Sequence, residues 1–451
     1  MKTRIIHLFE ALSSNFWAIP LLLLISGAGL AFLNIYLDKT LYARHIELPE
    51  LYLYFNNALN IRTLLSVSAT SILGVAGVSF SITIASLTLA SQQFGPRLLK
   101  NFMSDKFNQL VLGCFIGTFL YCILMLQFTG SMDVAKTTPF FSMIGLLAII
   151  ILNLLLLVFF IHHIAVAIQA ETVISEVNNE LVNQMSCTFP NKADENSEPI
   201  QFEIPDNLNN KFEQKGEEIY STKSGYLQAI DIDNLVSCVI DNDCAIKVII
   251  KPGDFILTNS VIAYSLMSDE DNKIEKEINA HLLIGNVATS EQDPEFAIRQ
   301  LVEVAVRALS PGINDPFTAI SCIKKLGENI AFLMAREFPT KYHVDDNGKL
   351  RVELKPFTFS AIVGTSFDLV RQHGQDDVAV VICLLQVLNQ LILQSQHKEH
   401  LEALKTQAEA IFSVNNSGTL ALKDKDDIQA LYDDINVSLN SKDSNLQIGC
   451  G

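Results

Sequence analysis

The sequence has 451 residues, which leaves room for a membrane part and one or two soluble modules beyond a single ordinary domain. Its formal net charge is −17, and this acidic surplus argues against a nucleic-acid partner, which would need a basic face. Hydrophobic residues make up 49% and charged residues only 18%, against a usual charged share of about a quarter.

The shortage of charge is concentrated in four intervals that hold no Asp, Glu, Lys or Arg: residues 11–37, 63–96, 107–132 and 137–170. A helix that crosses a bilayer needs about 20 apolar residues, and each interval exceeds this length. The sequence therefore predicts a transmembrane domain over residues 1–172. Its spans are expected near Phe16–Tyr36, Leu64–Ala90, Leu110–Phe128 and Phe140–Ile168. The first apolar run is too long for a cleaved signal peptide, and further spans follow it.

The basic residues and the cysteines give an expected orientation. The cytoplasmic basic set is Lys2, Arg4, Arg97, Lys100 and Lys106, and the outer set is Lys39, Arg44, Arg62 and Lys136. Five against four is a weak positive-inside bias. The eight cysteines form no C-x-x-C pair and have no zinc-like spacing with His, so they fit a reducing compartment. We expect both termini, and everything from Glu171 onward, to be cytoplasmic.

The second span is dense in small and hydroxylated residues, which form two stripes on roughly opposite sides of a helical wheel. The first stripe is Ser68, Ile72, Ala76, Ser79, Thr83, Ser86, Ala90 and Gln93, and the second is Ser81, Ala85, Thr88 and Gln92. Small residues let helices approach, so both stripes fit close packing. Alternatively, one stripe packs and the other lines a wet path in an oligomer. The pore-lining candidates are Ser68, Ala76, Ser79, Thr83, Ser86 and Gln93.

The predicted spans contain no Asp, Glu, Lys or Arg, which argues against a proton-coupled transporter or a voltage sensor. His162 and His163 lie near the inner end of the fourth span. Interfacial histidines without carboxylate neighbours are usually neither pH sensors nor metal ligands. The sequence therefore predicts no metal site.

After the spans, residues 173–215 are predicted to be a helical extension and a linker, and residues 216–290 a small β-rich module. The helical extension has apolar residues at Ile174, Val177, Leu181 and Met185. The expected strands are Tyr226–Ile230, Ala245–Lys251, Phe255–Leu257 and Val261–Leu266, with a turn at Pro252-Gly253-Asp254. The phrases Ser224-Gly225-Tyr226 and Lys251-Pro252-Gly253-Asp254-Phe255 resemble those of small barrel-sandwich modules that carry biotin or lipoate, but no Lys-Met tip accompanies them. We therefore expect no cofactor.

Residues 291–420 are predicted to form a helical domain and residues 421–451 a tail that frays after Ser441. Two helices begin with the same Asp-Pro device, at Asp293-Pro294 and at Asp315-Pro316. In the first of them Ala297, Leu301, Val304 and Ala308 face inward, while Arg299, Glu303 and Arg307 form a charged row typical of a solvated face. Further helices are expected near Phe359–Gln372, Asp377–Gln396 and His400–Phe412.

The corner between the two Asp-Pro helices is a candidate anion or ligand site. Its candidate residues are Arg307, Ser310, Asn314, Asp315 and Thr318. The free N–H groups at a helix start favour an anion, and Arg307 lies nearby. The competing interpretation, which we favour, is a tight αα-corner built by Pro, Gly and a capped helix start.

This corner, with Gln300–Val306 before it, resembles a bacterial family of predicted membrane proteins that carry a domain of unknown function (domain of unknown function 2254). Further matching phrases are Phe94-Gly95-Pro96-Arg97-Leu98-Leu99, Phe160-Ile161-His162-His163-Ile164-Ala165 and Pro252-Gly253-Asp254-Phe255. The resemblance runs from the first span to about Gln394. It implies a multi-pass location in the bacterial inner membrane and supplies no established activity.

The fold class expected is thus a membrane protein with about four N-terminal transmembrane helices and a soluble α+β region. No G-x-S-x-G, phosphate-binding Gly-rich loop or HExxH occurs, so we expect no enzyme. The favoured function is a homo-oligomeric channel or permeation pathway for small ions in the lipid bilayer, lined by the second helix. The alternative is a membrane-anchored regulatory or scaffold protein whose acidic domain binds a partner. Symmetry discriminates the two, because a channel places its second helices around an axis.

Overall fold

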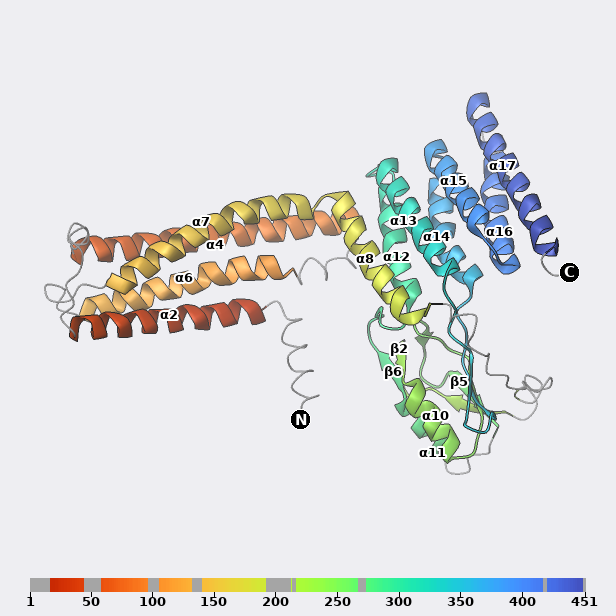
Figure 1. Ribbon diagram of the computed structural model, residues 1–451, viewed down its shortest axis with the longest axis horizontal. Coiled ribbons are helices and arrows are strands. Elements are labelled where there is room, and N and C mark those ends of the chain that lie inside the picture. Colours follow the sequence, from red (N-terminus) through yellow and green to blue (C-terminus); the bar gives the residue numbers. More distant parts are fainter. Residues whose placement is uncertain are drawn as a thin grey trace. The chain divides into compact units, whose positions relative to one another are not determined.

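The computed structural model describes residues 17–43, 58–95, 105–131, 140–191, 212, 216–266, 273–416 and 420–448. The chain forms two compact units, Met1–Thr172 and Val173–Gly451 (Figure 1). The predicted linker falls largely in residues 192–215, and of these only Phe212 is among the described residues. Pro96–Leu99 of the family phrases, together with the basic residues Lys2, Arg4, Arg44, Arg97, Lys100 and Lys136, also lie outside the described residues.

The first unit consists of long apolar helices. They are α2 (Ala18–Ala43), α4 (Ala58–Phe94), α6 (Lys106–Ser131) and α7 (Phe140–Ala167). Each is long and apolar enough to cross a membrane, which confirms the four predicted spans. The 37 residues of α4 extend about 55 Å at 1.5 Å per residue, against about 30 Å of hydrocarbon, so this helix projects beyond the bilayer core or tilts.

Helices α2 and α6 run parallel and touch through glycines. A Cβ atom on Gly27 would lie 2.5 Å from the carbonyl oxygen of Gly117, and one on Gly117 would lie 2.8 Å from the carbonyl oxygen of Leu23. Gly113 and Gly117 have the four-residue spacing of small residues that bring membrane helices together. The small residues of the second span predict close packing there, but this backbone contact joins the first and third spans.

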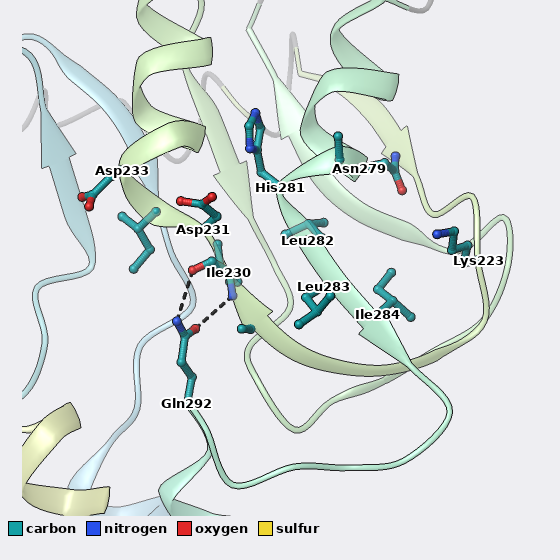
Figure 2. Close-up of a pocket in the computed structure, with 13 residues that line it drawn as sticks. Lys223, Ile230, Asp231, Asp233, Asn279, His281, Leu282, Leu283, Ile284 and Gln292 are labelled. Atoms are coloured by element: carbon teal, nitrogen blue, oxygen red, sulfur yellow. Dashed lines mark hydrogen bonds between the residues drawn. The ribbon is translucent and has the colours of Figure 1, made fainter. Parts of the chain in front are cut away.

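The second unit contains two small sheets. The larger has the order β1 (Glu217–Tyr220), β5 (Val261–Ser265), β3 (Ile246–Val248), β8 (Leu350–Glu353) and β7 (Tyr342–Val344). The smaller has the order β4 (Phe255–Ile256), β2 (Gly225–Ile230) and β6 (Leu282–Gly285). The β3–β8 pair is parallel and the other pairs are antiparallel. The side-chain amide of Gln292 acts like one more strand residue, because it bonds both the N–H and the C=O of Ile230 (Figure 2).

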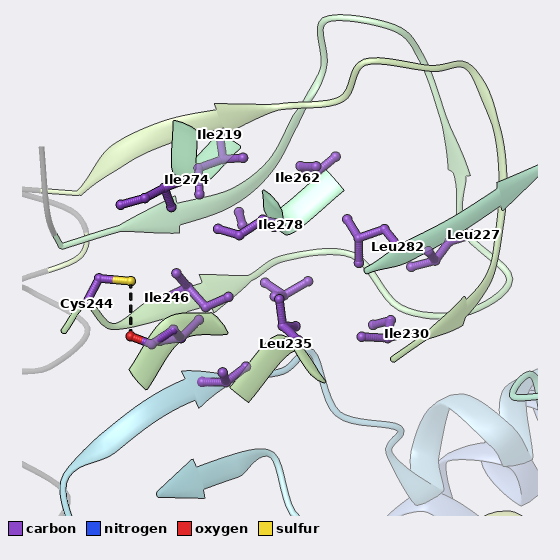
Figure 3. Packing of buried hydrophobic residues seen from close by; sticks show 14 of the residues in the cluster. Ile219, Leu227, Ile230, Leu235, Cys244, Ile246, Ile262, Ile274, Ile278 and Leu282 are labelled. Carbon is purple, nitrogen blue, oxygen red and sulfur yellow. Dashed lines mark hydrogen bonds between the residues drawn. The ribbon is translucent and has the colours of Figure 1, made fainter. Parts of the chain in front are cut away.

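One hydrophobic core serves both sheets and the two short helices α10 (Ile232–Asp241) and α11 (Lys273–Ala280) (Figure 3). Strands from both sheets contribute to it, for example Leu227 and Leu282 from the smaller sheet and Ile246 and Ile262 from the larger. Leu235 of α10 is fully buried among them. Predicted strands therefore exist at the four expected places, and the module also contains β1, β6, α10 and α11.

The rest of the second unit is helical. Its helices are α8 (Ala170–Thr188), α12 (Pro294–Ala308), α13 (Pro316–Met334), α14 (Phe359–Gly374), α15 (Val378–Gln394) and α16 (Lys398–Asn416). The predicted apolar faces of α8 and α12 are buried. Asn329 of α13 donates a 2.7 Å hydrogen bond to the side-chain oxygen of Asn178 in α8, which pins these two helices together.

Two predicted boundaries are wrong. Residues 291–420 are not all helical, because β7 and β8 return to the larger sheet, where β8 pairs with β3. The predicted tail at 421–451 contains helix α17 (Leu422–Ile448), which packs on α15 and buries Ile428, Ile435 and Leu439. Acidic and polar residues dominate this helix, so its narrow apolar stripe gave only a weak signal.

Candidate functional site

The first polar stripe of α4 is a packing face. Ser68, Ala76 and Ser79 are buried, Thr83 and Ser86 are half-buried, and Gln93 is exposed. Ile72 and Ala76 join an apolar cluster with Val111 and Phe115 of α6. The burial of Ser68, Ala76 and Ser79 favours the packing interpretation of this stripe, because small residues let α6 approach α4. A pore-lining role for the less buried Thr83, Ser86 and Gln93 stays a prediction.

The opposite face of α4 is exposed. It holds the second stripe and extends toward the start of the helix, and its small or polar members are Ser66, Thr70, Gly74, Gly77, Ser81, Ala85, Thr88 and Gln92. Added Cβ atoms on Gly74 and Gly77 would meet nothing within 4 Å. We call these eight residues the open stripe. It contrasts with the exposed surface of α7, which is built from large residues such as Ile151, Leu155 and Phe159.

Three hydroxyl groups of the open stripe are bonded within their own helix. Thr70 donates to the carbonyl of Ser66 at 3.0 Å, Ser81 to that of Gly77 at 2.9 Å, and Thr88 to that of Ile84 at 2.9 Å. Each hydroxyl oxygen therefore still has lone pairs that face outward. These three hydroxyl groups cost little in lipid, because their protons are bonded, and they offer oxygen acceptors to a neighbouring group.

An acidic residue lies inside the first membrane helix. The first span was predicted to end near Tyr36, but α2 continues to Ala43 and includes Asp38, which is 1% exposed. Its carboxylate accepts the backbone N–H groups of Phe141 and Ser142 and the hydroxyl of Ser142. This group is a helix cap supplied from another helix, since it satisfies the first N–H groups of α7.

A second carboxylate partners one of the two histidines at the end of the fourth span. The Nε2 atom of His163 lies 2.6 Å from Oδ2 of Asp105, and Oδ1 of Asp105 accepts the N–H of Phe107 at 2.9 Å. The interpretation that these histidines lack a carboxylate neighbour is therefore wrong for His163. Asp105 lies 58 residues away in the sequence, so the residues around His163 could not indicate this contact.

The corner between α12 and α13 satisfies its own polar groups. Asp315 caps α13 by accepting the N–H of Thr318 at 3.2 Å and its hydroxyl at 2.6 Å. The hydroxyl of Ser310 donates to the carbonyl of Arg307 at 2.6 Å, and Asn314 takes the left-handed backbone conformation with φ of +52°. The five candidate residues thus lie together, and the contacts among them are those of an architectural corner.

The start of α12 differs from that of α13. Asp293 makes no capping bond, because its carboxylate pairs with Arg299, and Lys251 pairs with Glu295. Burial raises the pKa of Asp293, and the charge of Arg299 opposes this effect. Arg299 was expected on a solvated face, so this expectation is wrong. The cluster fastens the Pro252–Asp254 turn to α12, since a Cβ atom on Gly253 would strike the Asp293 carboxylate.

Among the described residues, no group of three or more His, Cys, Asp or Glu side chains is placed to hold a metal ion. The polar clusters in both units join elements that are distant in the sequence. Their hydrogen bonds satisfy the polar groups of helix ends and turns. None of these clusters places a nucleophilic side chain beside a general base.

Four membrane-spanning helices followed by a mixed α and β soluble unit define a multi-pass membrane protein. The family described as Predicted membrane protein (DUF2254) matches residues 13–390, and the chain belongs to this family. Uncharacterised proteins of Mycobacterium bovis and of two strains of Mycobacterium tuberculosis are each 28% identical over 350 residues. The matched part covers 76% of this chain and 66% of these relatives, just under two thirds of their length. No solved structure matches the chain.

Proposed function

We propose that the chain is the subunit of a homo-oligomeric pathway for small ions, with the open stripe of α4 lining the path. The observation that carries this proposal is the exposure of a continuous small and hydroxylated face on a membrane helix whose opposite face is packed. The location we propose is the bacterial inner membrane, with both termini in the cytoplasm. The proposed path is still lined by the second membrane helix, α4, but by the open stripe and not by the residues chosen from the sequence.

The chemistry of the open stripe suits a path for ions with a weakly held hydration shell. Hydroxyl and carbonyl oxygens replace water around such cations in selectivity filters. The face carries no charged residue between Arg62 and the end of the helix, so it provides no ring of charge that would trap an ion. One such helix cannot enclose a path, and copies of α4 around a common axis are therefore required.

The alternative function is a membrane-anchored scaffold or regulator. A separate observation favours it: the α12–α13 corner exposes two large apolar side chains, Phe317 at 78% and Ile313 at 41%. Isolated apolar residues on a surface are ordinary, but a pair on one corner suits a protein contact. In a scaffold or regulator, the membrane helices would only pack against one another, and the acidic soluble unit would bind a partner.

Flux through liposomes that contain the purified full chain tests the channel. We expect K⁺ efflux from loaded vesicles, and we expect Ser81→Leu to reduce it strongly by filling the path with a large apolar side chain. Val78→Leu is the matched control, because Val78 is exposed on α4 outside the open stripe, and it should conduct like the unmodified chain. Vesicles that hold oligomers and do not leak would remove the channel and leave the scaffold.

A further inference from the structure

A small cavity lies between α4 and α6 in the membrane unit. Its volume is about 10 Å³, and its apolar lining consists of Phe80 from α4, Val111 and Leu112 from α6, and Phe160 from α7. A buried water molecule needs roughly 10–15 Å³ of space and about two to four polar partners. The cavity therefore has room for one water molecule, and the polar side chains around it decide whether one binds.

Three polar side chains also line this cavity: Ser79 and Thr83 from α4 and Asn108 from α6. Ser79 is 3% exposed, and its Oγ atom makes no hydrogen bond to any described residue. The same is true of the buried Oδ1 atom of Asn108. Buried polar atoms are nearly always hydrogen-bonded, either to protein or to ordered water. Both oxygen atoms therefore call for a partner that the neighbouring side chains do not supply.

The hydroxyl of Ser79 differs from the hydroxyls that follow it on α4. Ser81 and Thr83 each donate to a carbonyl one turn earlier in the helix, at 2.9 Å and 3.0 Å. Ser79 makes no such bond, so its proton is available to the cavity. Asn108 offers an acceptor to the same cavity, yet the two side chains do not bond to each other. A bridging water is the usual link between polar groups that face each other without touching.

We propose that one buried water molecule binds in this cavity and joins α4 to α6. The water accepts the proton of Ser79 and donates its own protons to Oδ1 of Asn108 and Oγ of Thr83. The oxygen of Thr83 can accept, because its proton is already given to the carbonyl of Ser79. A metal cation fits this set less well, since a cation takes only lone pairs and would leave the Ser79 proton unbonded.

The site lies one helical turn from the contact between Asp105 and His163. Asn108 follows Asp105 by three residues on α6, and Phe160 precedes His163 by three on α7. The Asp105–His163 contact joins α6 to α7, and the water joins α4 to α6. Three helices are thus fastened at this end of the unit. This role goes beyond the proposed pathway, because Ser79 lies on the packed face of α4 and not on the open stripe.

The first experiment is a crystal or cryo-electron microscopy structure of the full chain, at a resolution that shows ordered water. We expect a density peak within hydrogen-bonding distance of the oxygen atoms of Ser79, Thr83 and Asn108. Asn108→Leu, which keeps the size of the side chain but removes its acceptor, should lose this peak. A direct hydrogen bond between Ser79 and Asn108, or a cavity without density, would overturn the proposal.

The second experiment is a double-mutant cycle followed by thermal unfolding in detergent. Ser79→Ala and Asn108→Leu each remove one partner of the water, so each should lower the melting temperature. The double variant should lose less than the sum of the two, because both changes act on the same water. Ser71→Ala is the matched control, since Ser71 is exposed on α4 and lies outside the cavity lining. If the two losses simply add, Ser79 and Asn108 act independently and the bridge is wrong.

A change of salt separates a water molecule from a cation. The melting temperature should be the same in potassium, sodium and choline chloride at equal concentration. A rise specific to potassium or sodium that disappears in both Ser79→Ala and Asn108→Leu would place a cation in the cavity and overturn the proposal. Ion flux through liposomes tests the pathway separately, so either proposal can fail while the other stands.

Discussion

Asp38 on α2 and Ser142 on α7 are 104 residues apart in the sequence, and the carboxylate of Asp38 accepts the backbone N–H of Ser142 at 3.1 Å. The same carboxylate accepts the N–H of Phe141 at 2.7 Å. Tyr121 of α6 adds a bond to the carbonyl of Ser142 at 2.9 Å, and Asn34 donates to the Tyr121 hydroxyl at 3.0 Å. Three helices are therefore tied together at one end of the membrane unit.

We predict that Asp38→Ala destabilises the membrane unit. The change leaves the N–H groups of Phe141 and Ser142 without an acceptor, and each unsatisfied buried group costs about 1–3 kcal/mol. Asp38→Asn retains one acceptor oxygen and should lose less. Thermal unfolding in detergent measures both, and an Asp38→Ala variant that melts with the unmodified chain would contradict the capping role.

The contact between α2 and α6 gives a second prediction with a built-in control. Gly27→Ala forces a methyl group against the backbone of α6 and should cost about 1–3 kcal/mol, the usual penalty of overpacking. Gly29→Ala lies two residues away in open space, so it should be neutral or slightly stabilising in a helix. Melting temperatures that fall equally for both variants would contradict the role of this contact, because only Gly27 lies against the backbone of α6.

The two faces of α4 predict opposite crosslinking behaviour. The sequence alone placed Ser79, Thr83 and Ser86 at the contact between copies, but Ser79 is only 3% exposed within one copy. We now expect Ser81→Cys and Gly77→Cys to crosslink copies in native membranes and Ser79→Cys to remain unlinked. Crosslinks at Ser79 without crosslinks at Ser81 would reverse this assignment.

At the α12–α13 corner we predict a loss of stability without any change in ligand response. Removing a good N-cap costs about 0.5–2 kcal/mol, so Asp315→Ala should lower the melting temperature, while Asp315→Asn still caps and should be tolerated. Arg307→Gln should melt like the unmodified chain with and without phosphate. If phosphate stabilises the unmodified chain and Arg307→Gln abolishes this effect, the corner is an anion site.

The ion pairs of the β7–β8 hairpin predict that the stability of the second unit depends on pH in the acid range. Hydrogen bonds from Lys349 and Arg351 lower the pKa of Asp243 to about 2. A carboxylate with a lowered pKa contributes stability above its unfolded value near 3.8, and this contribution disappears as the pH falls toward 2. Arg351→Gln removes part of it, so acid unfolding followed by circular dichroism should begin at a higher pH. Lys325→Gln, which breaks an exposed pair on α13, should leave the acid transition unchanged.

The sequence by itself determined the elements whose signals are local. Four charge-free intervals became four membrane helices, because a bilayer requires about 20 apolar residues wherever the chain crosses it. The same holds for Asp315-Pro316, where residues within one turn of each other start and cap α13. The turn at Gly253 could also be predicted from the sequence, since its φ of +93° favours glycine.

Only the tertiary structure decided which face of each element is used and which distant residues meet. Periodicity found two polar stripes on α4 but could not rank them, because the choice depends on where α6 lies. Local patterns likewise placed His163 without revealing Asp105. They assigned residues 342–353 to a helical domain, because the partner strand β3 precedes that domain in the sequence. These contacts join positions separated by tens to hundreds of residues, so no spacing rule along the chain encodes them, and packing selects them only once the helices and sheets have assembled.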